Sequence, residues 1–308
     1  MWREYRIYFF MKKSFVSILS TDSYLPGIIV LYFSLKETKT KFPFLCLTTP
    51  NISLDTLITL SSYDIKYKRL GFNILNPTDI DRKHRWSNTY SKLHIFNQTE
   101  FSKIVYLDAD MLVLKNIDEL FKKPHMSAVS AGSMLIRRSH WTHLNSGLIV
   151  IKPYRNLFIN MLSKIGKIEN IKASHNEYKS TGGDQDFLNE YYKNWPKESR
   201  LHLDHKYNIF HHYLHEYNKD IGYSLSKGKK LVKILHFASH LKPWEITKKN
   251  LHNEKRTAIE IKVINLWKNI YKKIKNTYNP TLNYSELRNS KTNPKLYKIQ
   301  SEGVVSAL

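Results

Sequence analysis

The chain has 308 residues, which suffice for one large hydrophobic core, so we expect one α/β domain with an appendage rather than two equal domains. Lys and Arg total 49 against 26 Asp and Glu, and the formal net charge of +23 would attract polyanions. The charge comes mostly from lysine, and no zinc-finger, RNA-recognition or helix-turn-helix signature accompanies it. Nucleic-acid binding is therefore a remote alternative, and we expect no nucleic acid as the main partner.

The cysteine content and the hydropathy favour a cytoplasmic protein. The single cysteine, Cys46, cannot form an intramolecular disulfide, so nothing in the sequence requires an oxidising compartment. No stretch approaches the roughly 18 apolar residues of a membrane span. Residues 1–10 lack a signal-like apolar core and a small-residue cleavage site, and we expect them to be an extension ahead of the domain.

Hydrophobic patterning predicts strands that alternate with helices along most of the chain. In chain order, the expected strands are residues 14–19, 42–47, 65–70, 103–107, 126–130, 147–151 and 231–236, and the expected helices are 24–36, 53–62, 88–97, 154–165 and 185–192. Such alternation is typical of a mostly parallel central sheet with helices on both faces. In sheets of this kind, ligands bind at the carboxyl ends of the strands.

The composition changes after Trp244. Residues 256–275 predict one lysine-rich helix, and the remainder is rich in Asn, Lys and Ser and is expected to be loosely ordered. We therefore expect a domain over residues 11–245, followed by a lysine-rich, helical C-terminal extension over residues 246–308.

Two carboxylates, Asp108 and Asp110, follow the apolar run 103–107. Charged groups at the edge of a core carry a large desolvation penalty unless a cation meets them. With one residue between them, both carboxylates can converge on one ion, and their hard oxygen ligands suit Mg²⁺ or Mn²⁺, which are commonly shared with phosphates. An Asp-rich turn that merely closes a strand is the alternative, and the tripeptide alone does not decide between the two.

Three further polar motifs lie near the ends of predicted elements. Asn145-Ser-Gly147 leads into a strand, and its glycine permits a tight turn, although this is also common turn chemistry. Gly182-Gly-Asp-Gln-Asp186 opens a helix, and its polar side chains could point at a ligand or merely cap the helix. After the last strand, His236 could be a third metal ligand and Lys242 could contact a phosphate, although a lone His at such a position is usually structural.

In this order, the four motifs resemble the glycogenin-like family of retaining glycosyltransferases. The resemblance covers roughly residues 15–244 and is most specific over residues 101–121, which are similar to the family along their whole length. Residues 15–24 are similar to the family's nucleotide-binding first strand and turn, and residues 89–93 to its Thr-Lys-Leu helix. The resemblance implies an α/β fold with a single GT-A, Rossmann-like domain that binds a nucleotide sugar and a divalent metal.

The resemblance also implies roles for individual residues. The metal, Mn²⁺ or Mg²⁺, would be held by Asp108, Asp110 and His236. The catalytic residues would be Lys92, Asp184 and Gln185. The residues expected to bind the UDP-sugar, with Tyr24 stacking on the base, are Ser20, Thr21, Tyr24, Arg82, Arg85, Lys92, Asp108, Ala109, Asp110, Asn145, Ser146, Asp184, Gln185, Ser239 and Lys242.

The implied reaction moves a hexose from UDP-glucose or UDP-galactose to a hydroxyl of a glycan, a protein or a small molecule, with retention at the anomeric carbon. Two departures from the family's pattern bear on the donor. Thr181 stands where the glycogenin branch has Asp, and Ser239-His240 replaces a Gly-containing step of the phosphate loop. A non-catalytic nucleotide-sugar- or glycan-binding relative is the alternative, although the intact metal ligands argue against it, and a homodimer stays open.

The family includes members that glycosylate themselves on a tyrosine. Counted without gaps from Tyr207-Asn208, the matching position is His215, which lies between Tyr213 and Tyr217. Histidine cannot accept the sugar as a stable tyrosyl-like ether, and a shift of two residues would misplace the acceptor oxygen. We therefore expect this chain to use a separate acceptor.

Overall fold

The central sheet is mostly parallel, as the sequence predicts. The computed structural model describes residues 12–77, 88–166, 182–228, 230–253 and 256–278. The sheet has the strand order β3-β2-β1-β4-β7-β6, with β1 (Lys12–Leu19), β2 (Phe44–Thr48), β3 (Tyr67–Arg69), β4 (Phe101–Leu107), β6 (Ser127–Ala128) and β7 (Leu148–Ile151). Strands β1 to β4 run parallel, whereas β7 runs antiparallel to β4 and β6. The end of β4 and the start of β7 therefore lie at the same edge.

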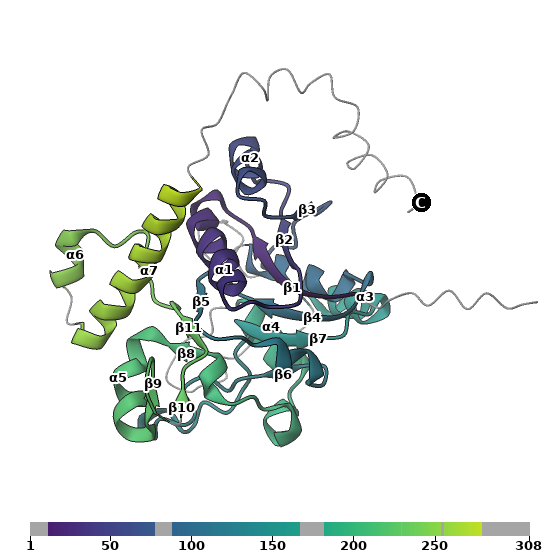
Figure 1. Ribbon diagram of the computed structural model, residues 1–308. Helices are drawn as coiled ribbons and strands as arrows, with labels where there is room; N and C mark the ends of the chain where they lie inside the picture. Colours follow the sequence, from purple (N-terminus) through teal and green to yellow (C-terminus); the bar gives the residue numbers. More distant parts are fainter. Residues whose placement is uncertain (1–11, 78–87, 167–181, 229, 254–255, 279–308) are drawn as a thin grey trace, which may run out of the picture.

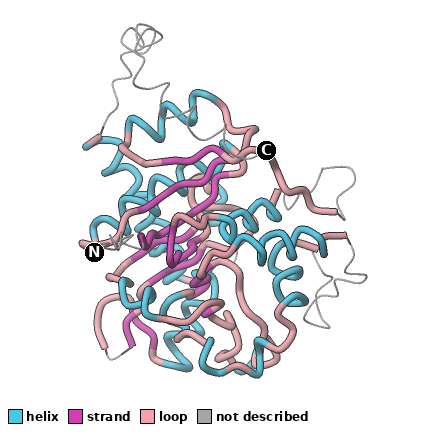
Figure 2. The backbone as a smooth tube through the Cα atoms, turned by 90° about the vertical axis from the view of Figure 1, so that its right-hand side faces the viewer, coloured by secondary structure: helices cyan, strands magenta, loops and turns pink. Residues whose placement is uncertain are grey.

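Helices cover both faces of this sheet because side chains alternate along each strand. On β4, Val105 and Leu107 belong to one buried cluster, whereas Tyr106 between them belongs to the other. Figure 2 shows the strands enclosed between helical layers. These layers include α1 (Leu25–Glu37) and α2 (Leu54–Ser62) on one side, and α3 (Arg155–Lys164), α4 (Asp184–Tyr191) and the 3₁₀ helix η2 (Thr89–Asn97) on the other.

A second, three-stranded sheet lies beside the first and was not predicted. It has the order β5-β11-β8, with β5 (Met111–Val113), β8 (Ile209–Phe210) and β11 (Ile234–His236). The predicted last strand, residues 231–236, thus contributes β11 to this small sheet rather than to the central one. Strand β11 runs antiparallel to β5 and parallel to β8.

Short elements connect these parts. Two strands, β9 (Tyr223–Ser224) and β10 (Lys230–Leu231), pair with each other in parallel. The other short helices of the described residues are the 3₁₀ helices η1 (Asp22–Tyr24), η3 (Asp118–Lys122), η4 (Ile136–Arg138), η5 (Trp195–Lys197), η6 (Ser199–Leu201), η7 (His205–Tyr207) and η8 (His211–Tyr213), the π-helix η9 (Tyr217–Ile221), and the α-helices α5 (Leu214–Glu216) and α6 (Lys248–Asn253).

The predicted lysine-rich helix is α7 (Ala258–Thr277), which packs beside α1 (Figure 1). Its first turn is capped by Thr257, whose side chain accepts a hydrogen bond from the Glu260 N–H. Its buried face carries Val263, Ile264 and Trp267, which join the same cluster as α1. The expected loose order beyond this helix, like the expected extension over residues 1–10, lies outside the described residues.

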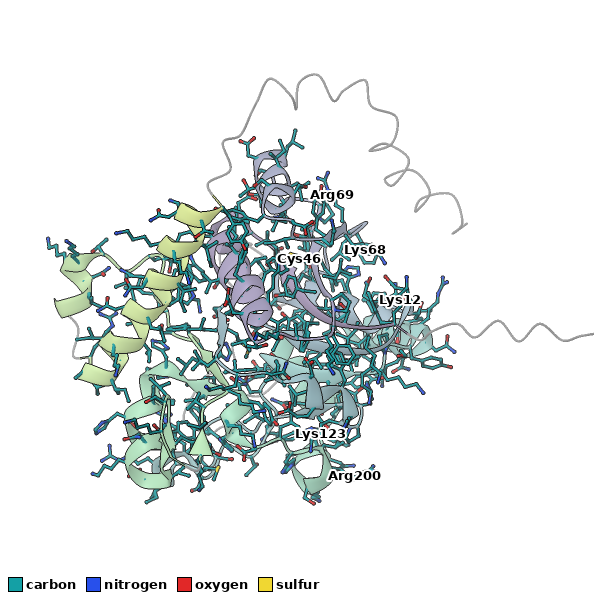
Figure 3. The ribbon with its side chains drawn as sticks, viewed as in Figure 1. Lys12, Cys46, Lys68, Arg69, Lys123 and Arg200 are labelled. Carbon is teal, nitrogen blue, oxygen red and sulfur yellow. The ribbon has the colours of Figure 1, made fainter. Side chains whose placement is uncertain are left out.

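Basic side chains are spread over the surface of the described chain. Figure 3 shows the exposed Arg69, Lys12, Lys123 and Arg200 spaced from the top of the molecule to its base. Cys46 is buried, as expected for a small apolar residue. Among the described residues, no helix is both long and apolar enough to cross a bilayer.

Trp267→Ala should lower the free energy of unfolding by about 3–5 kcal/mol, because this indole is 1% exposed in the core that α7 completes. Leu266→Ala is the matched control, since Leu266 lies next to it on the helix but is 36% exposed, and should cost only about 0.5 kcal/mol. Urea unfolding measures both values, and equal losses would contradict the docking of α7.

Candidate functional site

The polar motifs meet at the edge where β4 ends and β7 begins. Leu107 and Leu148 are partners in the antiparallel register, so the residues just outside them face each other. The Asp108 N–H donates to the Gly147 carbonyl at 2.8 Å. The first acid of the pair and the Asn-Ser-Gly motif are therefore joined by the sheet itself.

The second sheet brings His236 to the acid pair. Met111 on β5 is the register partner of His236 on β11, and the Phe237 N–H donates to the Asp110 carbonyl at 2.9 Å. One ligand atom from each of Asp108, Asp110 and His236 lies within 4.8 Å of the others. His236 Nε2 is 3.2 Å from Asp110 Oδ1 and 3.9 Å from Asp108 Oδ2.

This donor set fits a divalent cation. Two carboxylates and an imidazole suit Mn²⁺ or Mg²⁺. The Nδ1–H of His236 donates to Asn208 Oδ1 at 2.8 Å, because an amide oxygen can only accept, and this bond turns Nε2 toward the two carboxylates. The ammonium group of Lys242 already supplies one positive charge here, since its Nζ is 2.6 Å from Asp110 Oδ2.

A chain of amides connects His236 to the Gly-Gly-Asp-Gln motif. Asn208 Nδ2 donates to Asn145 Oδ1 at 2.7 Å, and Asn145 Nδ2 donates to Gln185 Oε1 at 2.8 Å. Gln185 Oε1 also accepts from the Ser146 N–H at 3.1 Å. No role was predicted for Asn208, because the two-residue strand β8 that follows it has no periodicity; the Tyr207-Asn208 pair used above to align the chain with the family was the available signal.

Gly147 lies in the expected turn and also allows a close contact with His236. A Cβ at this position would lie 2.5 Å from His236 Cε1 and 2.9 Å from Asn145 Oδ1. The expected turn is present, since residues 146 and 147 form a turn in which the Gly147 N–H donates to Asn145 Oδ1 at 3.0 Å, but the sequence did not indicate the contact with His236. Gly27 on α1 is similar, because its Cβ would lie 2.5 Å from the carbonyl oxygen of Ala109, between the two acids.

Lys92 on η2 joins the acid pair to α4. Its Nζ lies 3.1 Å from Asp108 Oδ1 and 2.7 Å from Asp184 Oδ2, and it donates to Ser146 Oγ at 3.0 Å. Ser146 Oγ donates to Asp184 Oδ2 at 2.8 Å. Burial opposes the charge of Lys92, but Asp108 and Asp184 outweigh it and raise the pKa of Lys92 above its ordinary value. Lys92 is therefore a fixed internal cation at this edge.

Lys242 is the corresponding cation on the other side of the acid pair. Besides Asp110, its Nζ contacts the Phe237 carbonyl at 3.0 Å. Burial would raise the pKa of Asp110, but Lys242 and His236 hold it well below its ordinary range. The loop that carries Lys242 is closed by Glu245, whose carboxylate accepts from the Lys242 N–H, and by Ser239, whose hydroxyl donates to the Leu241 carbonyl.

The remaining predicted residues lie near this cluster or outside the described ranges. Lys242 Nζ lies 5.9 Å from the centre of the Tyr24 ring, which also packs edge-on against Trp244 at 5.4 Å. Ser20 and Thr21 follow β1 and are partly exposed. The Ser20 carbonyl accepts a hydrogen bond from Asn51 Nδ2 at 2.8 Å, and the Thr21 and Ser23 hydroxyls are hydrogen-bonded at 2.9 Å. The predicted residues that lie outside the described ranges are Arg82, Arg85 and Thr181.

Lys92→Met should lower the free energy of unfolding by about 3–5 kcal/mol, because it leaves the carboxylates of Asp108 and Asp184 without their buried cation. Lys68→Met is the control: its pair with Glu100 is exposed, so its loss should cost at most about 1 kcal/mol. Denaturant titration separates the two, and a negligible effect at Lys92 would contradict the proposed charge balance.

Comparisons with known proteins identify the family of the chain. The family model described as Glycosyl transferase family 8 matches residues 15–248. Glycogenin-1 of Oryctolagus cuniculus is 29% identical over 279 residues, which cover 84% of this chain and 75% of that protein. Inositol phosphorylceramide glucuronosyltransferase 1 of Arabidopsis thaliana is 28% identical over 280 residues, 86% of this chain but only 47% of the plant protein. The chain thus spans about half the length of that plant relative.

Solved structures agree on the fold. The galactosyltransferase LgtC, in complex with donor and acceptor sugar analogs, has a TM-score of 0.57 and 13% identity, covering 84% of this chain and 95% of its own. The apo-form glycosyltransferase GlyE of Streptococcus pneumoniae TIGR4 has a TM-score of 0.54 and 16% identity, covering 86% of this chain and 64% of its own. The family match and the fold together establish that the chain belongs to glycosyl transferase family 8 and has its GT-A fold.

Proposed function

We propose that this chain is a metal-dependent retaining glycosyltransferase that moves glucose or galactose from a UDP-sugar to a hydroxyl acceptor. The observation that carries the proposal is the convergence of Asp108, Asp110 and His236 with two buried lysines at one sheet edge. Cleavage of the donor leaves negative charge on a nucleoside diphosphate, and positive charge at that position lowers the barrier. A bound metal ion, with Lys242 turned to a phosphate, would supply such charge at this site.

Asp108, Asp110 and His236 would hold Mn²⁺ or Mg²⁺, which supplies positive charge to the diphosphate when bound. Lys242 would then exchange its contact with Asp110 for a phosphate oxygen, since its ammonium already lies 2.6 Å from that carboxylate. Lys92 remains bound to Asp108 and Asp184, so we assign it to positioning these carboxylates as much as to neutralising the donor.

Asp184 and Gln185 would face the donor sugar. Gln185 Oε1 accepts hydrogen bonds from Asn145 and Ser146, which fix its direction and reduce its already low nucleophilicity. We therefore favour attack by the acceptor on the face that the leaving group occupies, with Gln185 and Asp184 stabilising the oxocarbenium-like centre from the opposite face. A covalent intermediate on Gln185 is the less favoured route.

Tyr24 would stack on the uracil base, and Ser20, Thr21 and Ala109 would line the nucleotide site. Tyr24 lies next to both Lys242 and Trp244, which supports a base beside the phosphates. Arg82 and Arg85 remain predicted phosphate contacts. A cytoplasmic location, a homodimer and the division of the chain at residue 245 also remain predictions.

A second donor, UDP-glucuronate, is the specific alternative. It is favoured by the names of two relatives from Arabidopsis thaliana, an inositol phosphorylceramide glucuronosyltransferase and a UDP-glucuronate:xylan alpha-glucuronosyltransferase. Because Thr181 stands where the glycogenin branch has Asp, the sequence does not restrict the donor to UDP-glucose or UDP-galactose.

Hydrolysis of UDP-glucose, UDP-galactose and UDP-glucuronate with and without Mn²⁺ tests the proposal. We expect metal-dependent release of UDP from one of them, and Asp110→Asn should abolish it, because the substitution removes a ligand charge but little volume. Since it also leaves Lys242 without its buried carboxylate, thermal unfolding should show that the variant is folded at the assay temperature. Asp64→Asn changes a carboxylate that is 74% exposed, and should leave turnover unchanged. Binding of a UDP-sugar without turnover by the unsubstituted protein would instead support the non-catalytic alternative.

Self-glycosylation should not occur at Tyr217. This side chain is fully buried, and its hydroxyl lies between the Gly132 N–H at 3.0 Å and His205 Nδ1 at 2.8 Å. A sugar there would break both hydrogen bonds and open the core. Intact mass spectrometry after incubation with the active UDP-sugar and Mn²⁺ should give an unmodified mass. Hexose units mapped to Tyr213 or Tyr217 would overturn the expectation of a separate acceptor.

A further inference from the structure

The side chain of Arg138 is clamped between two aromatic rings. Its guanidinium carbon lies 4.5 Å from the centre of the Trp141 ring and 4.1 Å from that of Tyr213. These residues come from two separate segments, η4 with the turn after it and η8. A guanidinium held by two rings is pre-organised, because little rotamer entropy remains to be lost when it binds a ligand.

The hydrogen-bonding capacity of this guanidinium is unused. Within the described part of the chain, Arg138 makes no ion pair and its side chain donates no hydrogen bond. Its planar fork carries five N–H donors, and two parallel bonds to the oxygens of a carboxylate or phosphate are its preferred arrangement. Arg138, which is partly exposed, therefore has donors available for a ligand.

Arg138, Trp141 and Tyr213 form an aromatic clamp, and the turn that carries its first two residues is anchored to the core through Gly132. Gly132 has φ +96°, and a Cβ there would lie 2.6 Å from Trp141 Cε3, so the indole rests directly on this glycine. The Gly132 N–H is held by the buried Tyr217 hydroxyl. The turn and the indole that it supports are thus anchored to the core rather than to the clamp alone.

Ring contacts connect the clamp with the metal-ligand cluster. Tyr213 contacts Phe210 with ring centroids 6.1 Å apart, and Phe210 contacts His236 at 5.3 Å. His212, which stacks on Phe210 and touches Tyr213 at 4.0 Å, lies between the two charged regions. Two rings, Tyr213 and Phe210, therefore separate Arg138 from His236, and the proposed function gives Arg138 no role at the donor phosphates.

We propose that Arg138 binds an anionic group, a phosphate or a carboxylate, on the acceptor that receives the sugar. The proposal rests on the transferase function above, under which the donor diphosphate is already served by the metal ligands and lysines. Trp141 and Tyr213 hold the guanidinium, and the rings give the apolar face of a neighbouring acceptor sugar a surface to contact. The site thereby selects acidic or phosphorylated glycans over neutral ones.

The test measures binding of three probe sugars to protein saturated with UDP and Mg²⁺, which fill the donor phosphate site. Glucose 6-phosphate and methyl β-D-glucuronide should bind at least about tenfold more tightly than methyl β-D-glucoside, the ratio expected for one charge-assisted pair. Calorimetry or ligand-observed NMR gives the affinities. Arg138→Met, which keeps an apolar stem between the rings, should abolish this preference, and Arg138→Gln provides a second neutral variant.

Arg137→Met is the matched control, because Arg137 is exposed on the same turn and should keep the preference. The proposal is overturned if the unsubstituted protein shows no preference, if the preference survives in Arg138→Met, or if Arg137→Met loses it equally. It is also overturned if Arg138→Met weakens binding of UDP-glucuronate alone, since Arg138 would then bind the carboxylate of the donor sugar rather than an anionic group on the acceptor. Thermal unfolding of each variant separates a structural role of the clamp from binding. The binding assay needs no turnover, so its outcome is independent of the hydrolysis assay that tests the transferase function.

Discussion

The site depends on the neutralisation of buried carboxylates by buried lysines at one sheet edge. Asp110 and Asp184 have side chains no more than 9% exposed, and Lys92 and Lys242, their partners, are as deeply buried. Desolvating each of these charges singly would cost several kcal/mol. As ion pairs, the carboxylates and the ammonium groups offset each other's desolvation penalty. Because each charge needs its partner at hydrogen-bond distance, the pairs also fix the positions of the segments that carry them.

The topology of the two sheets explains why residues far apart in sequence form this balance. A parallel β1–β4 pair and an antiparallel β7 place two strand ends and one strand start at the same edge. The small β5-β11-β8 sheet continues directly from Asp110 and returns His236 to it. The amide chain through Asn208 and Asn145 then links the imidazole to Gln185, so the metal-ligand cluster and the predicted donor-sugar residues form one hydrogen-bonded unit.

Much of this arrangement could be predicted from the sequence, because its elements carry local signals. The strand before Asp108 contains a short apolar, β-branched run, and the four motifs lie in a family-specific order, so the central sheet and the cluster of Asp108, Asp110 and His236 were expected. Strands β5 and β8 have three and two residues, too few for any periodicity, so the second sheet was missed. The role of Asn208 and the Arg138 clamp depend on contacts across many residues of sequence, and Gly147 owes its identity to a ring that approaches from another sheet.

Under the proposed function, Lys242 would leave Asp110 for the diphosphate when Asp108, Asp110 and His236 hold the ion. Metal and nucleotide should therefore bind cooperatively. Calorimetric titration of UDP with and without Mn²⁺ measures this coupling most directly. The account predicts that Mn²⁺ tightens UDP binding by roughly tenfold or more, since the ion carries much of the charge that meets the diphosphate. An affinity for UDP that is unchanged by Mn²⁺ would contradict it.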